Sequence, residues 1–515
     1  MRTSCSINLQ DETPRSGLST FTSDDEPPSK PSTVSHTPVL TGDSSATPVW
    51  PRQKQAYITL AACFFLMFNS WGLVNAYGTF ASFYMQELLP GRNMLLLNLV
   101  GSTESFLVLI FSFAVGRILD AGYHRALLAA GFILVPTGMG ALSRAAGNGG
   151  YNQGNYGLIW LFQGLIMGLG MSCFFVTSSQ IAATWFAKKK ALAIGIVASG
   201  ASIAGLVYPI MTKMLIQKIG FQYAVLCVAV VIAVTSCFAF TLAQPHPQHQ
   251  FRKPEKWMQV SLWIDTHAVS NASFSLFTAA IAFMFFGFYA VFFNFEEWAA
   301  AEGVGYKDRP TVPFPGSTEM FEARPKDALR TFYLLAMLNA FSTIGRIVAG
   351  YLSDHLGAVH VHAVVTFVSA ILISCLWIFC PTRAGTLAFV VLYGAISGSV
   401  IGLPPASIAH ILGHSRDAQS KLGQWTGMMY TVAAPFALTG PVIAGFLISK
   451  YKSYLPMQVW SAVSLLMSSV CMAWAGYLLH RQRGGKGLRG AVMRMRSMVS
   501  SDEKDEAEAR ETIDV

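Results

Sequence analysis

The stretch TWFAKKKALAIGIVASGASIAGLVYP (Thr184–Pro209) carries the two signals that decide the fold. Three consecutive lysines, Lys188–Lys190, stand directly before a run that contains no charged residue and is rich in Gly, Ala and Ser. Lysines next to an apolar run of this length are typical of a membrane helix that begins at the cytoplasmic surface. The stretch therefore predicts a membrane-spanning helix with its lysines in the cytoplasm.

Small residues recur in this run at Gly195, Ser199, Ser202 and Gly205. Gly195, Ser199 and Ser202 fall on one helical face, and Gly205 follows Ala201 by four residues. Small side chains at this spacing let two helix backbones approach closely in lipid, where hydrophobicity does not drive helices together. Two interpretations stay open, which are a static packing face and a face that slides or rocks against its neighbour.

The composition of the whole chain agrees with a membrane protein. Of its 515 residues, 53% are hydrophobic and 12% are charged, whereas a soluble globular chain carries about 25% charged residues. The formal net charge of +9 comes from short basic clusters beside apolar runs, a placement that suits membrane topology better than a nucleic-acid surface.

Apolar segments of helical length recur twelve times along the chain, six on either side of a basic, His-rich stretch. Each can cross a hydrocarbon core that takes about twenty helical residues, and in lipid such segments must be helices to satisfy their backbone hydrogen bonds. We expect an all-α membrane protein with twelve transmembrane helices in two six-helix bundles. The predicted parts are a disordered cytoplasmic tail 1–52, a bundle 53–245, a cytoplasmic linker 246–270, a bundle 271–480 and a cytoplasmic tail 481–515.

Two fragments indicate that the halves are related to each other. VGRILDAGYHR (Val115–Arg125) follows the second predicted helix, and AGYLSDHLG (Ala349–Gly357) follows the eighth. Each places an Asp after a helix end that contains Gly, with another Gly shortly after the Asp. The basic clusters lie mainly in loops on one side, so both termini are predicted to be cytoplasmic.

Several of these stretches together resemble a known family. WFAKKKALAIGIVASGASIAGLVYP resembles the fifth-helix signature of the monocarboxylate transporter branch of the major facilitator superfamily, and FNSWGLVNAYGTFASFY (Phe68–Tyr84) is similar to the first helix of its fungal members. The likeness extends over nearly all of the chain from Gln55 to Leu479. It implies two six-helix bundles related by a pseudo-two-fold axis, a substrate site between them near the midplane, and alternating access.

Two ionisable residues lie deep within predicted helices, where a charge is costly and so usually has a function or a partner. Glu104 suits a proton carrier, and the alternative is an acid that hydrogen-bonds a neighbouring helix. Arg346 suits an anionic substrate, because a guanidinium binds a carboxylate through two parallel hydrogen bonds. The resemblance aligns Arg346 with the arginine that mammalian monocarboxylate carriers use for substrate and proton coupling, and a structural arginine is the alternative.

The resemblance is incomplete at two of the coupling positions. Mammalian carriers have a lysine in the first helix where this chain has Asn75, and an aspartate one turn before the arginine where this chain has Ser342. Proton symport of a lactate-like substrate by that mechanism is therefore not expected. Either Glu104 takes over coupling, or the substrate is not a small monocarboxylate.

Arg117, Asp120 and Asp354 lie at predicted cytoplasmic helix ends and are candidates for a gate made of ion pairs between the bundles; ordinary interface charges are the alternative. Glu296 and Glu297 end the seventh predicted helix, where we expect them to be solvated. Five large aromatic residues are candidates for cavity walls, although helix packing is the commoner role: Trp71, Tyr77, Phe80, Tyr208 and Phe341.

The predicted function is secondary active transport of a small organic anion or secondary metabolite, coupled to protons, in the plasma membrane. Export is preferred to uptake because of the missing lysine and the aromatic-rich helices. The alternatives are an uptake permease for a monocarboxylate-like nutrient and a nutrient sensor on a transporter fold. The sequence contains no Gly-x-Ser-x-Gly, phosphate-loop or His-Glu-x-x-His motif, so an enzyme is not expected. We expect membrane lipid and protons as partners, with no cofactor, metal, nucleic acid or obligate protein partner.

Overall fold

A computed structural model describes residues 53–145, 147, 150–186, 189–249, 251, 253, 263–306, 329–379, 382–413 and 419–482. The predicted tail 1–52, the predicted tail 481–515 beyond Gln482, and Lys188 lie outside the described residues. The chain divides into two units, Met1–Thr47 and Pro48–Val515, and everything described belongs to the second.

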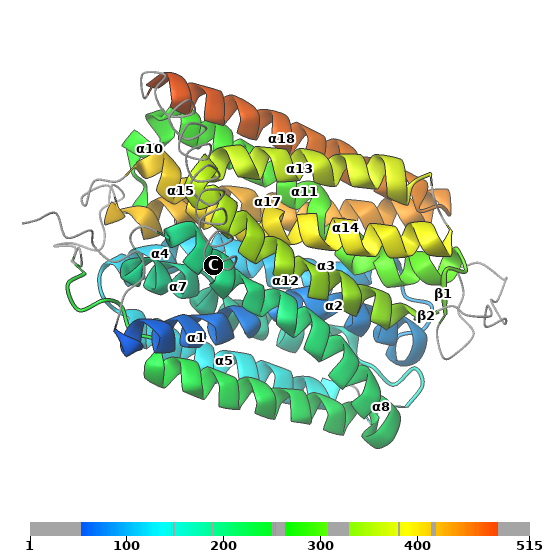
Figure 1. Ribbon diagram of the computed structural model, residues 1–515. Helices are drawn as coiled ribbons and strands as arrows, with labels where there is room; N and C mark the ends of the chain where they lie inside the picture. Colours follow the sequence, from blue (N-terminus) through cyan, green and yellow to red (C-terminus); the bar gives the residue numbers. More distant parts are fainter. Residues whose placement is uncertain are drawn as a thin grey trace, which may run out of the picture. The chain divides into compact units, whose positions relative to one another are not determined.

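Helices make up almost all of the N-terminal half of this unit (Figure 1). In chain order they are α1 Lys54–Phe68, α2 Trp71–Phe83, the π-helix η1 Tyr84–Leu88, α3 Met94–Ile110, α4 Ser112–Asp120, α5 His124–Ala145, α6 Tyr156–Ile159, the π-helix η2 Trp160–Met167, α7 Gly168–Trp185 and α8 Lys190–Leu242.

The C-terminal half is likewise helical, with one pair of two-residue parallel strands in which Gly305 lies opposite Leu329. In chain order its elements are α10 Thr266–Ser270, α11 Ala272–Ala301, β1 Gly305–Tyr306, β2 Leu329–Arg330, α12 Thr331–Leu356, α13 Ala358–Ile371, the π-helix η3 Leu372–Trp377, α14 Arg383–Gly402, α15 Pro404–Leu412, α17 Leu422–Tyr451 and α18 Leu455–Gln482.

Eleven helices among the described residues are long and apolar enough to cross a membrane, and one of them, α8, contains two of the predicted segments. The 53 residues of α8 would extend about 80 Å if straight, far more than a hydrocarbon core of about 30 Å. Gly220 interrupts it with φ 79° and ψ 167°, a conformation that glycine adopts readily because it has no Cβ. The chain turns back there (Figure 1), so the prediction of twelve segments is confirmed.

The first predicted helix is broken at Asn69 and Ser70, between α1 and α2. The Asn69 side chain donates to Ser236 Oγ at 2.9 Å and accepts from the Tyr208 hydroxyl at 3.0 Å. These bonds stabilise the break because they satisfy a polar side chain that is fully buried. Trp71 is thereby placed at the first position of α2.

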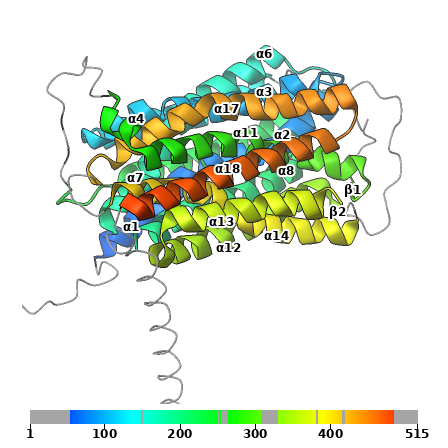
Figure 2. The same cartoon turned by 90° about the horizontal axis from the view of Figure 1, so that it is seen from above.

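The two halves contact each other along three sets of helices: α8 with α12, α17 with both α3 and α4, and α2 with α11. Figure 1 shows α8 beside α12, and Figure 2 shows α17 beside α3. We call the end of the bundle that holds α10 the linker end, and the end that holds β1 and β2 the opposite end. The linker end is the one that the sequence predicts to be cytoplasmic.

The expectation of a solvated end for α11 is wrong. Glu296 is 3% exposed and Glu297 is 6% exposed. Glu296 accepts hydrogen bonds from the hydroxyls of Thr79 and Thr331. Helix α2 and the start of α12 pack over this end of α11, a tertiary contact that the local sequence does not reveal.

Candidate functional site

Arg346 lies where the two halves meet, in the middle of α12. It is 4% exposed, and its Nη1 donates to the backbone oxygen of Ala198 in α8 at 2.8 Å. Its Nε lies 3.4 Å from Ser342 Oγ. None of the described carboxylates lies within ion-pair distance of this guanidinium. A buried charge without a charged partner is costly, so Arg346 is equipped to receive an anion.

The predicted small-residue face of α8 packs directly on α12. A Cβ placed on Gly195 would lie 2.5 Å from the backbone oxygen of Arg346. Ser202 Oγ lies 2.9 Å from Ser342 Oγ, across the boundary between the halves. Ser199 instead donates to the backbone oxygen of Ile196 within its own helix.

Gly205 extends this interface toward the opposite end, whereas Asn75 makes its contact within the N-terminal half. A Cβ on Gly205 would lie 2.5 Å from Asn339 Oδ1 of α12. Asn75 of α2 is 2% exposed and donates to the backbone oxygen of Ala201 at 3.3 Å. The structure thus brings Ser342, Arg346 and the α8 residues together, while Asn75 contacts α8 at Ala201.

Asp354 and Asp120 occupy equivalent positions in the two halves. Asp354 Oδ1 and Oδ2 accept from the backbone amides of Ala191 and Leu192 at 2.9 and 3.0 Å, at the start of α8. Asp120 Oδ2 accepts from the amide of Gln424 at 3.0 Å, at the start of α17. Each carboxylate therefore contacts the N-terminus of a helix in the other half, where free amides and the helix dipole favour negative charge.

The described hydrogen bonds of Asp120 and Asp354 are with backbone amides, and the ion pairs that the sequence suggested stay a prediction. The acids bind backbone amides of helix starts, and the predicted gating role itself stays a prediction. Arg117, the third predicted gate residue, is 4% exposed. Beside it, a Cβ on Gly116 would lie 2.4 Å from the backbone oxygen of Gly423, so α4 and α17 are in close contact at the linker end.

Contacts also join the halves at the opposite end. Asn98 Nδ2 of α3 donates to the backbone oxygen of Pro441 in α17 at 3.0 Å. Ser449 Oγ of α17 donates to Asn93 Oδ1, just before α3, at 3.1 Å. With the bond from Thr79 to Glu296, these contacts hold the halves together at the end away from the linker.

Glu104 lies apart from Arg346, inside the N-terminal half. It is fully buried, and neither carboxyl oxygen makes a hydrogen bond of normal geometry. The Gln163 amide of η2 and the phenols of Tyr77 and Tyr84 are near enough to interact with it electrostatically. These neighbours belong to the same half, so the described contacts do not place Glu104 and Arg346 in one site.

Five aromatic side chains meet at mid-depth between the halves, and we call them the aromatic cluster. Its members are Trp71, Phe175, Phe285, Tyr289 and Tyr430. The rings of Trp71 and Tyr289 are stacked, with centroids 5.3 Å apart and an interplanar angle of 16°. Of these five residues, the sequence analysis named only Trp71. Nothing in a sequence shows which aromatic residues of two different halves will be in contact.

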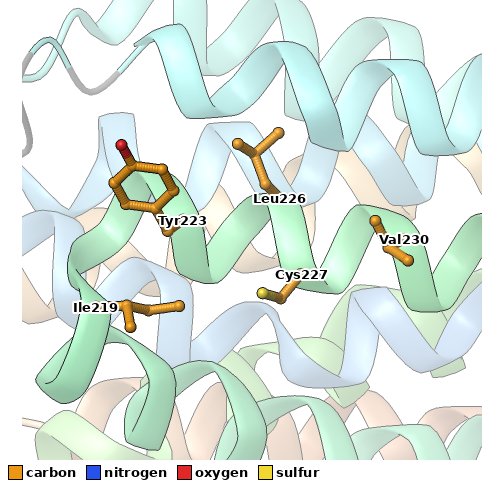
Figure 3. Close-up of a pocket in the computed structure, with 5 residues that line it drawn as sticks. All are labelled: Ile219, Tyr223, Leu226, Cys227 and Val230. Atoms are coloured by element: carbon orange, nitrogen blue, oxygen red, sulfur yellow. The ribbon is translucent and has the colours of Figure 1, made fainter.

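The described residues also form a surface cavity of about 650 Å³ on α8, at the turn at Gly220 and the part of the helix that follows it. Figure 3 shows its lining residues, which are Ile219 just before the turn at Gly220 and, after the turn, Tyr223, Leu226, Cys227 and Val230. Tyr223 and Val230 are 64% and 62% exposed. The cavity faces outward, away from the contact between the halves, and we assign it no part in the site.

The described residues contain no cluster of three or more His, Cys, Asp or Glu side chains that could hold a metal ion. The groups that meet between the two halves are the buried guanidinium of Arg346, the serine hydroxyls beside it and the rings of the aromatic cluster. Such a set of groups has the chemistry to bind an organic anion through hydrogen bonds, charge and ring contacts.

Comparisons with known proteins agree with this geometry. The family model described as Major Facilitator Superfamily matches residues 60–420. The aspyridones efflux protein apdF of Emericella nidulans is 27% identical over 427 residues, which are 82% of this chain and 78% of that protein. The agnestins efflux protein AgnL12 of Paecilomyces divaricatus is 25% identical over 471 residues, covering 91% and 96%.

A further relative is the MFS-type transporter dbaD of Emericella nidulans, 27% identical over 81% of this chain and 86% of that protein. Among solved structures, the E. coli fucose:proton symporter FucP has the same fold, with a TM-score of 0.54, 13% identity, and coverage of 82% of this chain and 99% of that chain. The chain therefore belongs to the Major Facilitator Superfamily and is a membrane transporter rather than an enzyme.

Proposed function

We propose that this transporter exports an organic anion, of the secondary-metabolite class, by alternating access. One observation carries the proposal: Arg346 is buried at the contact between the halves, without a carboxylate partner among the described residues. The names of two relatives, which are efflux proteins for aspyridones and agnestins, support the direction and the substrate class.

Alternating access requires that the halves part at one end while they stay joined at the other. At the linker end, they are joined by hydrogen bonds from helix-start amides to Asp120 and Asp354. At the opposite end, Asn98 and Ser449 make the joining contacts. Each set consists of a few hydrogen bonds beside close glycine contacts, and such bonds re-form after separation.

Glu104 is our candidate for coupling transport to protons. It is fully buried, and it has no hydrogen bond of normal geometry and no cation beside it among the described residues. A carboxyl in such surroundings exchanges a proton when a conformational change admits water. Because Glu104 and Arg346 share no contact, coupling would act through the helices between them.

We also assign the chain to the monocarboxylate transporter-like branch of the superfamily, on the likeness of Thr184–Pro209 and Phe68–Tyr84 to that branch. The positions of the basic clusters support an orientation with both termini in the cytoplasm, and the proposed export function would place the protein in the plasma membrane. The apolar outer faces of its helices would contact lipid.

The test compares metabolites inside native cells and in their medium, with and without this gene. Export predicts that a compound accumulates inside and disappears from the medium on deletion. Slower consumption of a medium compound would instead indicate uptake, and unchanged pools would favour a sensor. Reintroducing Arg346→Ala should behave like the deletion, whereas Arg383→Ala, at an exposed arginine of the same half, should restore the normal pools.

Proton coupling is tested with Glu104→Gln, which keeps the size of the side chain but cannot carry a proton. We expect transport by this variant to lose its dependence on the proton gradient. Glu302→Gln, at an exposed glutamate, serves as the control. An unchanged response of Glu104→Gln to the gradient would exclude Glu104 as the carrier.

A further inference from the structure

We propose that the aromatic cluster is the recognition surface of this transporter and that it takes a planar, conjugated organic anion with hydrogen-bond acceptors. The inference rests on the proposed transport function and narrows its substrate class. Two observations support it. The cluster is divided between the two halves, and two of its polar atoms, Trp71 Nε1 and the Tyr289 hydroxyl, make no hydrogen bond among the described residues.

The cluster consists of two aromatic walls, one from each half. Trp71 of α2 and Phe175 of α7 form the wall of the N-terminal half, with ring centroids 5.2 Å apart. Phe285, Tyr289 and Tyr430 form the wall of the C-terminal half. The walls meet through the stack of Trp71 on Tyr289 and through Phe175 and Tyr430, whose centroids are 4.8 Å apart.

When the halves part at either end, these ring contacts between the walls are the ones that must loosen. The separated walls would then present the parallel faces of Trp71 and Tyr289 to whatever enters. A flat conjugated molecule replaces the lost ring contacts on both sides, because aromatic rings favour offset stacking at centroid distances of about 4.5–7 Å. A saturated molecule of the same size has no such faces.

Two hydrogen-bond donors in the walls have no partner among the residues that the structure describes. Trp71 Nε1 and the Tyr289 hydroxyl make no hydrogen bond, although these residues are only 2% and 1% exposed. Buried Trp and Tyr usually find a partner for these atoms. A substrate oxygen or nitrogen that accepts from them would satisfy both walls at once.

The charge preference comes from Arg346. Arg346 belongs to the same half as the C-terminal wall, is buried against α8, and is close enough to Tyr289 for an electrostatic interaction. An anionic oxygen conjugated to the flat ring system, such as a carboxylate, phenolate or enolate, would reach Arg346 while the rings lie between the walls.

A second aromatic group in the C-terminal half provides a matched comparison. Trp377 stacks on Phe389 at 5.2 Å and contacts Trp298 at 5.4 Å, all within one half. Trp377 is also buried, and its Nε1 likewise makes no hydrogen bond. Because both sides of this group belong to the same half, opening of the transporter would not separate it.

The experiment measures binding to the purified full-length protein in lipid nanodiscs by calorimetry, with naphthalene carboxylate and its saturated counterpart, decalin carboxylate, as probes. We expect the planar acid to bind about 10-fold more tightly or better. Trp71→Phe and Tyr289→Phe, which keep a ring and remove one donor, should each weaken its binding about 3- to 10-fold. Trp377→Phe should leave the affinity unchanged, and melting temperatures check that each variant is folded.

Three results would overturn the inference: equal affinity for the two acids, binding of neither acid, or equal losses in Trp71→Phe and Trp377→Phe. Failure of the proposed function would be seen separately, in the comparison of metabolite pools with and without the gene. A protein that binds the planar acid as described but leaves all pools unchanged would retain this recognition surface and act as a sensor.

Discussion

Substituting Gly195 by Ala tests whether close contact between α8 and α12 is required for the linker end to close. The added Cβ would lie 2.5 Å from the backbone oxygen of Arg346 and 3.5 Å from the Cα of Gly350. The first contact is shorter than a Cβ tolerates, and a backbone oxygen within a helix cannot move aside cheaply. The two helices must therefore separate slightly.

Overpacking of this kind costs about 1–3 kcal/mol. The cost applies only while α8 and α12 are in contact, so it favours the state that is open at the linker end. A difference of 1–3 kcal/mol changes the ratio of two states by about 5- to 150-fold. As long as most molecules are closed at the linker end, the population that is open at that end should rise about 5- to 150-fold.

The assay is the rate at which a polar, membrane-impermeant maleimide labels a cysteine introduced as Ser342→Cys. Ser342 is 1% exposed in the closed contact between α8 and α12, so labelling reports opening. The same chain with Ser342 retained corrects for the native cysteines. Gly140→Ala is the matched control, because a Cβ there meets no atom within 4 Å.

Gly195→Ala should label Ser342→Cys about 5- to 150-fold faster, and Gly140→Ala should not change the rate. Both substitutions favour helix formation by about 1 kcal/mol, so their difference isolates the contact between helices. Equal labelling rates in the two variants, with equal transport, would refute the reasoning. The small-residue face of α8 would then be a packing face that tolerates larger side chains.

Three further predictions concern the ends of the bundle. Asp354→Ala removes the two hydrogen bonds to the amides that begin α8, a loss of about 0.5–2 kcal/mol by analogy with helix capping, and should speed the same labelling reaction; an unchanged rate would count against a gate there. Thr79→Val removes the hydrogen bond to Glu296 and should have the converse effect, with slower labelling from the linker end. Burial alone would raise the pKa of Asp265, but hydrogen bonds from Lys421 and a neighbouring indole hold it below its ordinary value. The carboxylate therefore stabilises the fold above about pH 4, the usual pKa of an unfolded Asp, and this stability is lost as the pH falls through the lower folded pKa. Asp265→Asn should lower the melting temperature at neutral pH and reduce its fall in acid.

The related positions of Asp120 and Asp354 give the two halves the same means of closing. Each acid lies in the last turn of a helix of its own half and accepts from amides that begin a helix of the other half. The sequence repeat predicted that the two acids correspond to each other. Their partners could not be predicted, because backbone amides at a helix start look the same in every sequence.

The membrane class, the twelve segments and the superfamily all follow from the sequence by itself. Hydrophobic length, charge depletion and the flanking lysines are local properties of the chain, and lipid leaves a long apolar segment no alternative to a helix. The small residues from Gly195 to Gly205 likewise predicted a close helix contact before any partner was known.

Only the tertiary structure decided which groups meet. The burial of Glu296, the contact of Arg346 with Ala198 and the stacking of Trp71 on Tyr289 all depend on helices that are far apart in the chain. A side chain's depth along its helix can be counted from the sequence, but the direction it faces depends on how that helix is rotated against its neighbours. That rotation is set by the packing of both halves together, and it is what turns single polar and aromatic residues into a site.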